Sequence, residues 1–244
     1  MKDNFSKQAS EYSKFRPHYP NEMIDYIVSL TRERNLALDV ATGNGQVAFK
    51  LSNYFKQVYA TDISINQLTN ASQSDTIIYQ NEPAEKTSFT DKTFDLITVA
   101  QAIHWFDFDS FYKEVNRILK PDGIFAVLGY GLFTTNPESD VILQEFYHQI
   151  VGPYWDKERK YIDEHYQTIP FPFRELKAEQ FKNEFIWTFE QLIGYLETWS
   201  AIQHYISKNN LNPIDLIHND LKSSWEKNDK KVTFPLLLRI GKLK

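Results

Sequence analysis

The chain has 244 residues, which suits one large α/β domain with a modest addition better than two independent domains. Its formal net charge of −5 argues against nucleic acid as the main partner, because phosphate contacts require a basic surface. It contains no cysteine, which excludes a disulfide framework, a thiolate metal site and a cysteine nucleophile.

The first residues lack the apolar stretch of a signal peptide. The longest apolar run, over 124–133, spans about ten residues, whereas a membrane span needs about twenty. We therefore expect a cytoplasmic protein that does not cross or bind a membrane. The sequence leaves the oligomeric state open.

Residues 1–35 predict an N-terminal helical cap before the first strand. Tyr12, Arg16 and Tyr19 lie in a segment where two prolines fix the backbone, and apolar residues then recur at helical spacing from 21 to about 32. The planar guanidinium of Arg16 is suited to binding a carboxylate, whereas the alternative is an ordinary surface arginine.

The stretch over 36–48 predicts a short apolar strand, a sharp turn and a helix. Gly43 and Gly45 permit positive φ and a close approach by a ligand, which would face the N–H groups at the start of the helix. The same residues also fit the G-x-G-x-x-A form of a dinucleotide fingerprint. Asp39 on the strand favours a ligand with positive charge over a pyrophosphate.

Further apolar strands are predicted over 58–62, 76–80, 94–100 and 124–128, with helices between them. This alternation predicts a mostly parallel sheet with right-handed crossovers. Residues 36–135 would form the ligand-binding core of a single domain that covers 1–244.

After Gly131 the pattern changes. Residues 137–230 predict a helical lid that binds the substrate, with closing strands near 181–189 and 232–240. We expect these two strands to form an antiparallel hairpin at the edge of the sheet, where Pro235 is tolerated.

Several residues at strand ends are candidates for chemistry. Asp62 ends the second strand, where its carboxylate can accept hydrogen bonds from ribose hydroxyls; a simple acid at a helix start is the alternative. Gln101, His104 and Trp105 follow the fourth strand. His104 is a candidate general base or a structural histidine, and Trp105 could stack on a substrate or belong to the core. The other histidines lack ligand spacing, so no metal site is expected.

The motif from Asp39 to Gly45, acidic-x-x-x-Gly-x-Gly, resembles the first motif of class I S-adenosylmethionine-dependent methyltransferases, although Ala41 and Val47 stand where many members have glycine. The resemblance implies a Rossmann-like α/β fold of three αβα layers. Its sheet would be mostly parallel, with an antiparallel last strand and a helical lid. The cofactor would be S-adenosyl-L-methionine, and the reaction an in-line methyl transfer to a small molecule.

Three shorter stretches are similar to a subgroup resembling trans-aconitate methyltransferases. They are Tyr-x-x-x-Arg-Pro-x-Tyr-Pro from Tyr12, His-Trp-Phe from His104, and the segment between Tyr195 and Ser200. This similarity places a carboxylic acid among the candidate acceptors.

The resemblance also assigns roles to individual positions. The implied cofactor-binding residues are Tyr12, Arg16, Asp39, Ala41, Gly43, Gly45, Asp62, Ile63, Ala84, Glu85 and Gln101. The implied substrate-binding residues are Tyr19, His104, Trp105 and Trp199, with His104 as the catalytic candidate. Ala84 and Glu85 follow the third strand, near the expected adenine.

Three other functions stay open. A nicotinamide-dependent oxidoreductase would use the fingerprint at Gly43, although Asp39 argues against it. A binding protein could retain the cofactor without turnover, and a protein or RNA methyltransferase is disfavoured by the acidic net charge. A carboxylate acceptor would need no base, whereas a phenol, an amine or a carbon acid would give His104 that role.

Overall fold

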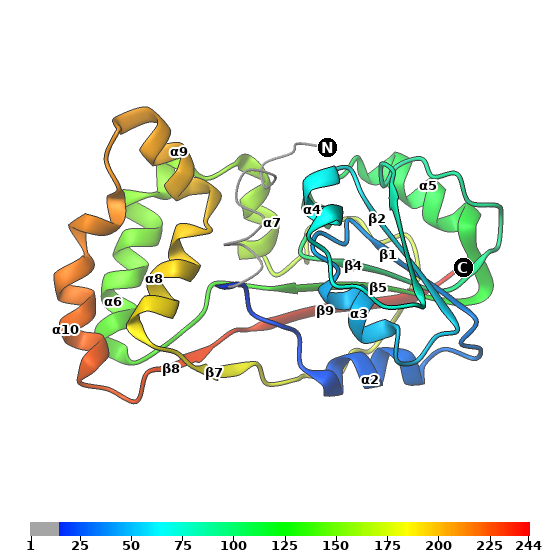
Figure 1. The fold of residues 1–244 in the computed structure, drawn as a ribbon, viewed down its shortest axis with the longest axis horizontal. Coiled ribbons are helices and arrows are strands. Elements are labelled where there is room, and N and C mark those ends of the chain that lie inside the picture. The colour runs from blue at the N-terminus through cyan, green and yellow to red at the C-terminus, as the bar shows by residue number, and fades with distance from the viewer. Residues whose placement is uncertain (1–14) are drawn as a thin grey trace.

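In the computed structural model, which describes residues 15–244, a seven-stranded sheet has the order β3-β2-β1-β4-β5-β9-β6 (Figure 1). Its strands are β1 (Leu36–Val40), β2 (Gln57–Asp62), β3 (Ile77–Asn81), β4 (Phe94–Ala100), β5 (Leu119–Tyr130), β6 (Arg174–Leu176) and β9 (Leu236–Lys242). The first five strands pair in parallel, and β9 pairs antiparallel to both β5 and β6. The predicted mostly parallel sheet with an antiparallel last strand is confirmed.

Helices cover both faces of this sheet because the strand side chains alternate. Ala37 and Leu96 pack with α2 (Asn21–Ser29) and α3 (Gln46–Leu51) in one core cluster. Their neighbours on the strands, represented by Leu38 and Ile97, pack in a second cluster with α5 (Phe108–Ile118). In Figure 1, α2 and α3 lie on the opposite side of the sheet from α5. The strands are thus buried on both faces, as their nearly continuous apolar sequences predict.

Short polar residues fix where two helices begin. The side chain of Ser64 accepts a hydrogen bond from the Gln67 backbone N–H and so caps the start of α4 (Ile65–Thr69). Asp107 likewise accepts from the Ser110 backbone N–H at the start of α5 (Phe108–Ile118). Both helices therefore start immediately after the carboxyl end of a strand or its following turn.

Apart from the segment that carries β6, residues 137–230 form a mainly helical lobe beyond one end of the sheet, at the left of Figure 1. Its helices are α6 (Pro137–Glu145), which continues as a π turn over Phe146–Ile150, α7 (Lys160–Asp163), α8 (Phe189–Glu197), α9 (Ser200–Asn209) and α10 (His218–Glu226). Short 3₁₀ turns cover Gly152–Tyr154, Lys157–Arg159 and Pro213–Leu216. α7 lies between the other helices of the lobe and the sheet.

The predicted closing hairpin of 181–189 with 232–240 at the edge of the main sheet is wrong. The chain forms two strands there, β8 (Lys231–Thr233) and β9, with Pro235 between them. β8 pairs with β7 (Glu184–Ile186) in a separate two-stranded sheet. Proline has no N–H to donate to a ladder, so the strand is interrupted where it passes from one sheet to the other.

The strand beside β9 is instead β6, which follows a segment rich in proline and phenylalanine. An ion pair between Glu175 and Arg239, with two hydrogen bonds of 2.8 and 2.9 Å, fixes β6 on β9. This edge therefore depends on a contact between residues far apart in the sequence.

Within residues 15–244, no helix combines the length and the apolar character that crossing a bilayer requires.

Candidate active site

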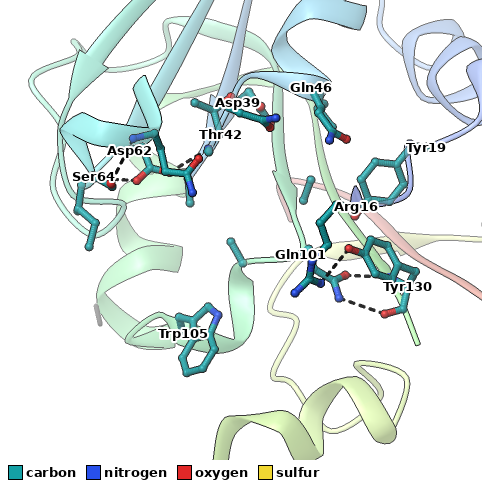
Figure 2. Close-up of a pocket in the computed structure, with 18 of the residues that line it drawn as sticks. Arg16, Tyr19, Asp39, Thr42, Gln46, Asp62, Ser64, Gln101, Trp105 and Tyr130 are labelled. Atoms are coloured by element: carbon teal, nitrogen blue, oxygen red, sulfur yellow. Dashed lines mark hydrogen bonds between the residues drawn. The ribbon is translucent and has the colours of Figure 1, made fainter. Parts of the chain in front are cut away.

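A cavity opens at the carboxyl ends of β1, β2 and β4, and we call it the first cavity (Figure 2). The predicted site residues that line it are Arg16, Tyr19, Asp39, Ala41, Gly43, Asp62, Ile63, Gln101 and Trp105. In Figure 2, Asp62 and Ser64 lie on one side, and Arg16, Gln101 and Tyr130 lie on the opposite side. This edge of an open α/β sheet is where such folds bind ligands.

The two glycines of the turn serve different purposes. Gly43 and Gly45 both have left-handed backbones, with φ of 57° and 80°. A Cβ on Gly45 would collide with the ring and hydroxyl of Tyr79, so close packing excludes a side chain there. A Cβ on Gly43 would have only the Gln67 Oε1 atom nearby, at 3.9 Å, so this glycine leaves backbone open beside the cavity.

Asp39 is almost completely buried and anchors the turn. One carboxylate oxygen accepts from the Thr98 hydroxyl at 2.7 Å, and the other accepts from the Thr42 hydroxyl at 2.6 Å and the Ala48 N–H at 3.2 Å. Burial raises the pKa of Asp39 to about 6; the three hydrogen bonds oppose that shift, and the neighbouring charge of Asp62 adds to it. A cationic ligand in the cavity would favour the ionised form.

Asp62 connects the glycine turn to the start of α4. Its two carboxylate oxygens accept from the backbone N–H of Gly43 at 2.9 Å and of Ser64 at 2.8 Å. A carboxylate oxygen can accept more than one hydrogen bond, and Asp62 lines the first cavity. The geometry is compatible with the predicted contact to a ribose.

Two residues other than glycine adopt left-handed backbones at the floor of the site. Ala41 follows β1 with φ of 52°, and Gln101 follows β4 with φ of 54°. Such conformations carry strain in residues with a Cβ, and they persist only where the surroundings impose them. At Gln101 the side-chain amide supplies that constraint, because it donates to the Tyr130 carbonyl at 3.1 Å and accepts from the Tyr130 N–H at 2.9 Å.

Arg16 joins the sheet to the helical lobe. One terminal nitrogen donates to the Tyr130 hydroxyl and the other to the Thr198 carbonyl, both at 3.1 Å. The Tyr19 and Tyr130 rings lie 6.1 Å apart beside it. Tyr12, predicted to act with these residues, lies outside the described residues.

A second cavity adjoins the first, and three residues, Arg16, Gln101 and Trp105, line both. The remaining lining residues are His104, Trp155, Asp156, Arg159, Ile162, Trp199 and Ser200. Most of these come from the helical lobe. The second cavity therefore lies between the sheet and the lobe.

His104 lines the second cavity rather than the first. Its Nδ1 atom lies 3.3 Å from the Tyr166 hydroxyl, and its ring is almost fully buried. Burial, followed by the positive charges of Arg159 and Arg16, lowers the pKa of His104 to about 3. The imidazole is therefore neutral at physiological pH and is a weak proton acceptor.

Gly45, Ala84 and Glu85 are not among the described residues that line either cavity. Glu85 Oε1 instead accepts from the Asp107 backbone N–H at 3.3 Å. The adenine contact assigned to Ala84 and Glu85 stays a prediction.

The sequence did not point to Gln67, Tyr130, Trp155 or Arg159 as lining residues. Gln67 is buried, and its Oε1 atom faces the turn without a hydrogen-bond partner. Its position on α4, one turn after Ser64, is the only local signal that could have identified it. The two lobe residues carry no such signal, because only packing brings them to the sheet.

The first cavity suits a positively charged nucleoside. It offers two carboxylates, an open backbone at Gly43 and an amide oxygen of Gln67 without a partner. Such groups can receive hydroxyl, amino and cationic groups, whereas a phosphate would meet two like charges. Within residues 15–244, no group of three or more histidine and acidic side chains is placed to hold a metal ion.

Comparisons with known proteins agree with this chemistry. A family profile described as a methyltransferase domain matches residues 38–127. A Dictyostelium discoideum protein named as a candidate methyltransferase is 33% identical, over 98% of this chain and 95% of its own length. A Saccharomyces cerevisiae protein named as a candidate S-adenosylmethionine-dependent methyltransferase is 25% identical, over 90% of this chain and 88% of its own.

Among solved structures, a candidate type II methyltransferase from Anaeromyxobacter dehalogenans superposes with a TM-score of 0.86. It is 33% identical, and the match covers 93% of this chain and 98% of that one. The similarity therefore extends over the sheet and the helical lobe together.

Proposed function

Because this chain belongs to the class I S-adenosylmethionine-dependent methyltransferases, we propose that it methylates a small molecule held in the second cavity. The observation that carries this proposal is the wall of Arg16, Gln101 and Trp105, which lines both cavities. A cofactor in the first cavity and an acceptor in the second would meet at this wall.

The cofactor, S-adenosylmethionine, supplies a methyl group on a positively charged sulfur. On our proposal, Asp62 binds the ribose hydroxyls, and Gly43 and Ile63 lie against the nucleoside. Asp39 provides negative charge beneath the turn, and Arg16 and Gln101 shape the side nearest the acceptor. These roles are supported by the residues that line the first cavity and by the ability of carboxylate oxygens to accept hydrogen bonds from hydroxyl groups.

We also propose that the acceptor is a carboxylic acid. Its support is the charge of the second cavity, whose lining within residues 15–244 includes Arg16 and Arg159, a neutral His104 and a single carboxylate, Asp156. A carboxylate needs no base before an in-line transfer, so a weakly basic histidine is adequate beside it. On this proposal, His104, Trp105 and Trp199 position the acceptor, as the resemblance to trans-aconitate methyltransferases implies. Tyr19, predicted to act with them, lines the first cavity and not the second.

The helical lobe would then act as the lid of the site. Residues 36–135 contribute most of the first cavity, whereas the lobe contributes Trp155, Arg159 and Trp199 to the second. Positioning the acceptor and excluding water are the tasks that remain for the protein when the leaving group is already activated.

The test is methyl transfer from labelled cofactor to a panel of small acids, including aconitate, with phenols and amines of similar size. We expect labelled ester from one or more acids. Labelled phenol or amine products would overturn the acid assignment, and an absence of any labelled product would support a binding protein without turnover. Calorimetry with S-adenosylhomocysteine and NAD checks the cofactor: binding of NAD alone would favour an oxidoreductase.

A further inference from the structure

Resting on the proposed function, we propose that Arg159 determines acceptor specificity by pairing with a carboxylate of a small organic acid. Arg159 lies on the 3₁₀ turn that precedes α7, in the helical lobe, and its side chain is 15% exposed. It is far from the glycine turn in sequence, and no motif predicts a role for it.

Contacts to its Nε atom and to an aromatic ring fix the orientation of the Arg159 guanidinium. Its Nε donates to the Tyr147 hydroxyl at 2.6 Å and lies 3.4 Å from Asp163 Oδ1. The Tyr147 hydroxyl in turn donates to Asp163 at 2.6 Å. The guanidinium carbon lies 4.5 Å from the centroid of the Trp155 ring, so the cation is also stacked. Little side-chain entropy would be lost when this group bound a ligand.

The two terminal nitrogens of Arg159 remain available. Among residues 15–244, none accepts a hydrogen bond from either of them, although Arg159 lines the second cavity. A guanidinium held at Nε presents its remaining N–H groups in a planar fork, and a carboxylate matches that geometry. A single anionic atom or a neutral hydroxyl could not accept hydrogen bonds from both terminal nitrogens in this planar geometry.

The charges around Arg159 also favour an anion. Arg16 and Arg159 line the second cavity, and Asp156 is the only acidic residue among its described lining residues. The Asp156 carboxylate lies 3.9 Å from His204 Nδ1. Over residues 15–244, the lining of the second cavity has two cations and one anion, whereas that of the first cavity has one cation, Arg16, and two anions, Asp39 and Asp62. The adjoining cavities thus suit ligands of opposite charge.

The walls indicate what the acid is attached to. Trp105, Trp155 and Trp199 all line the second cavity, and the rings of the last two lie 5.4 Å apart. Indole surfaces favour an apolar or conjugated frame over a polar one. The ligand class is therefore a small carboxylic acid with an apolar or unsaturated frame.

The experiment measures the binding of benzoate and maleate to the full chain by calorimetry, with S-adenosylhomocysteine present at saturation. Benzamide is the uncharged counterpart of benzoate. The variants are Arg159→Met, Arg159→Lys and the matched control Arg32→Met, because Arg32 is exposed and pairs only with Asp122 among its described contacts. The affinity of each variant for S-adenosylhomocysteine and its thermal midpoint are recorded in parallel.

We expect Arg159→Met to weaken binding of the acids by about 10- to 100-fold while leaving benzamide and S-adenosylhomocysteine affinity unchanged. Arg159→Lys should restore part of the loss, and Arg32→Met should bind as wild type does. Turnover of an accepted acid should show a raised KM with a smaller change in kcat.

Equal acid affinity in wild type and Arg159→Met would overturn the assignment, and so would failure of wild type to bind either acid. Either result would leave the methyltransferase function intact as long as S-adenosylhomocysteine still binds. Loss of affinity for benzamide to the same degree as for benzoate would show a packing role instead. If the wild type did not bind S-adenosylhomocysteine, that result would count against the proposed function.

Discussion

The side-chain amide of Gln101 forms hydrogen bonds with both backbone groups of Tyr130. This pairing extends the contact between β4 and β5 by one residue beyond the ladder, and it holds Gln101 in its left-handed conformation. The Tyr130 hydroxyl accepts from Arg16, which also donates to Thr198 in the helical lobe. One chain of hydrogen bonds therefore fixes the wall that the two cavities share.

Gln101→Leu should remove this constraint. The Tyr130 N–H and C=O would lose their partners, so we expect the free energy of unfolding to fall by about 2 kcal/mol. We also expect kcat/KM to fall, because Arg16 would lose its fixed partner. Urea denaturation and methyl-transfer kinetics check the two effects. The control Gln144→Leu changes an exposed glutamine on α6, and equal behaviour of the two variants would contradict the prediction.

Asp62→Ala should weaken binding of S-adenosylhomocysteine by about 2 kcal/mol, the order expected for hydrogen bonds to a charged group. The side chain also accepts from the Gly43 and Ser64 N–H groups, so part of the loss would come from a loosened turn. Calorimetry of the variant and of Asp62→Asn measures the effect. Unchanged affinity in Asp62→Ala would remove this residue from the cofactor site.

Binding of S-adenosylmethionine should tighten as pH rises through 6. The pKa of Asp39 is raised from 3.8 to about 6 by burial, and a cationic ligand favours the ionised carboxylate. Binding therefore releases protons in this range, more for the sulfonium cofactor than for S-adenosylhomocysteine, whose sulfur is neutral. Calorimetry with both ligands from pH 5 to 8 checks this, and Asp39→Asn should flatten the profile. A pH-independent ratio of the two affinities would contradict it.

His104 should make stability depend on pH. The pKa of His104 is lowered from 6.5 to about 3. Its contribution to the free energy of unfolding is therefore fully present above pH 6.5 and is lost as the pH falls toward 3. Between pH 7 and 5 the wild type should lose about 2 kcal/mol relative to His104→Gln. The wild type is compared with His104→Gln because Asp39 is present in both. The raised pKa of Asp39 increases stability as the pH falls, which is opposite to the effect of His104. Urea denaturation at both pH values measures it, and equal pH dependence would show that His104 is not buried as described.

The parallel part of the fold could be predicted from sequence because its signals are local. The strand predicted over 94–100 has the bounds of β4, and Ser64 caps the helix that begins at the next residue. The glycine turn and Asp62 also reach one cavity, since the carboxyl ends of parallel strands share an edge. The edge of the sheet could not be predicted in this way. Its partner strand is β6 rather than the segment at 181–189, because Pro235 interrupts the ladder and Arg239 selects Glu175.

The sequence by itself determined the αβα class and the turn from Asp39 to Gly45, because neighbouring residues along the chain specify both. Only the tertiary structure decided that Tyr130 holds Gln101, that His104 shares a cavity with two arginines, and that Arg159 lines that second cavity. Each of these relations joins segments that are distant in sequence. The first depends on how β4 and β5 pair within the sheet, and the other two depend on how the helical lobe packs against the sheet. No pattern within one segment encodes either kind of packing.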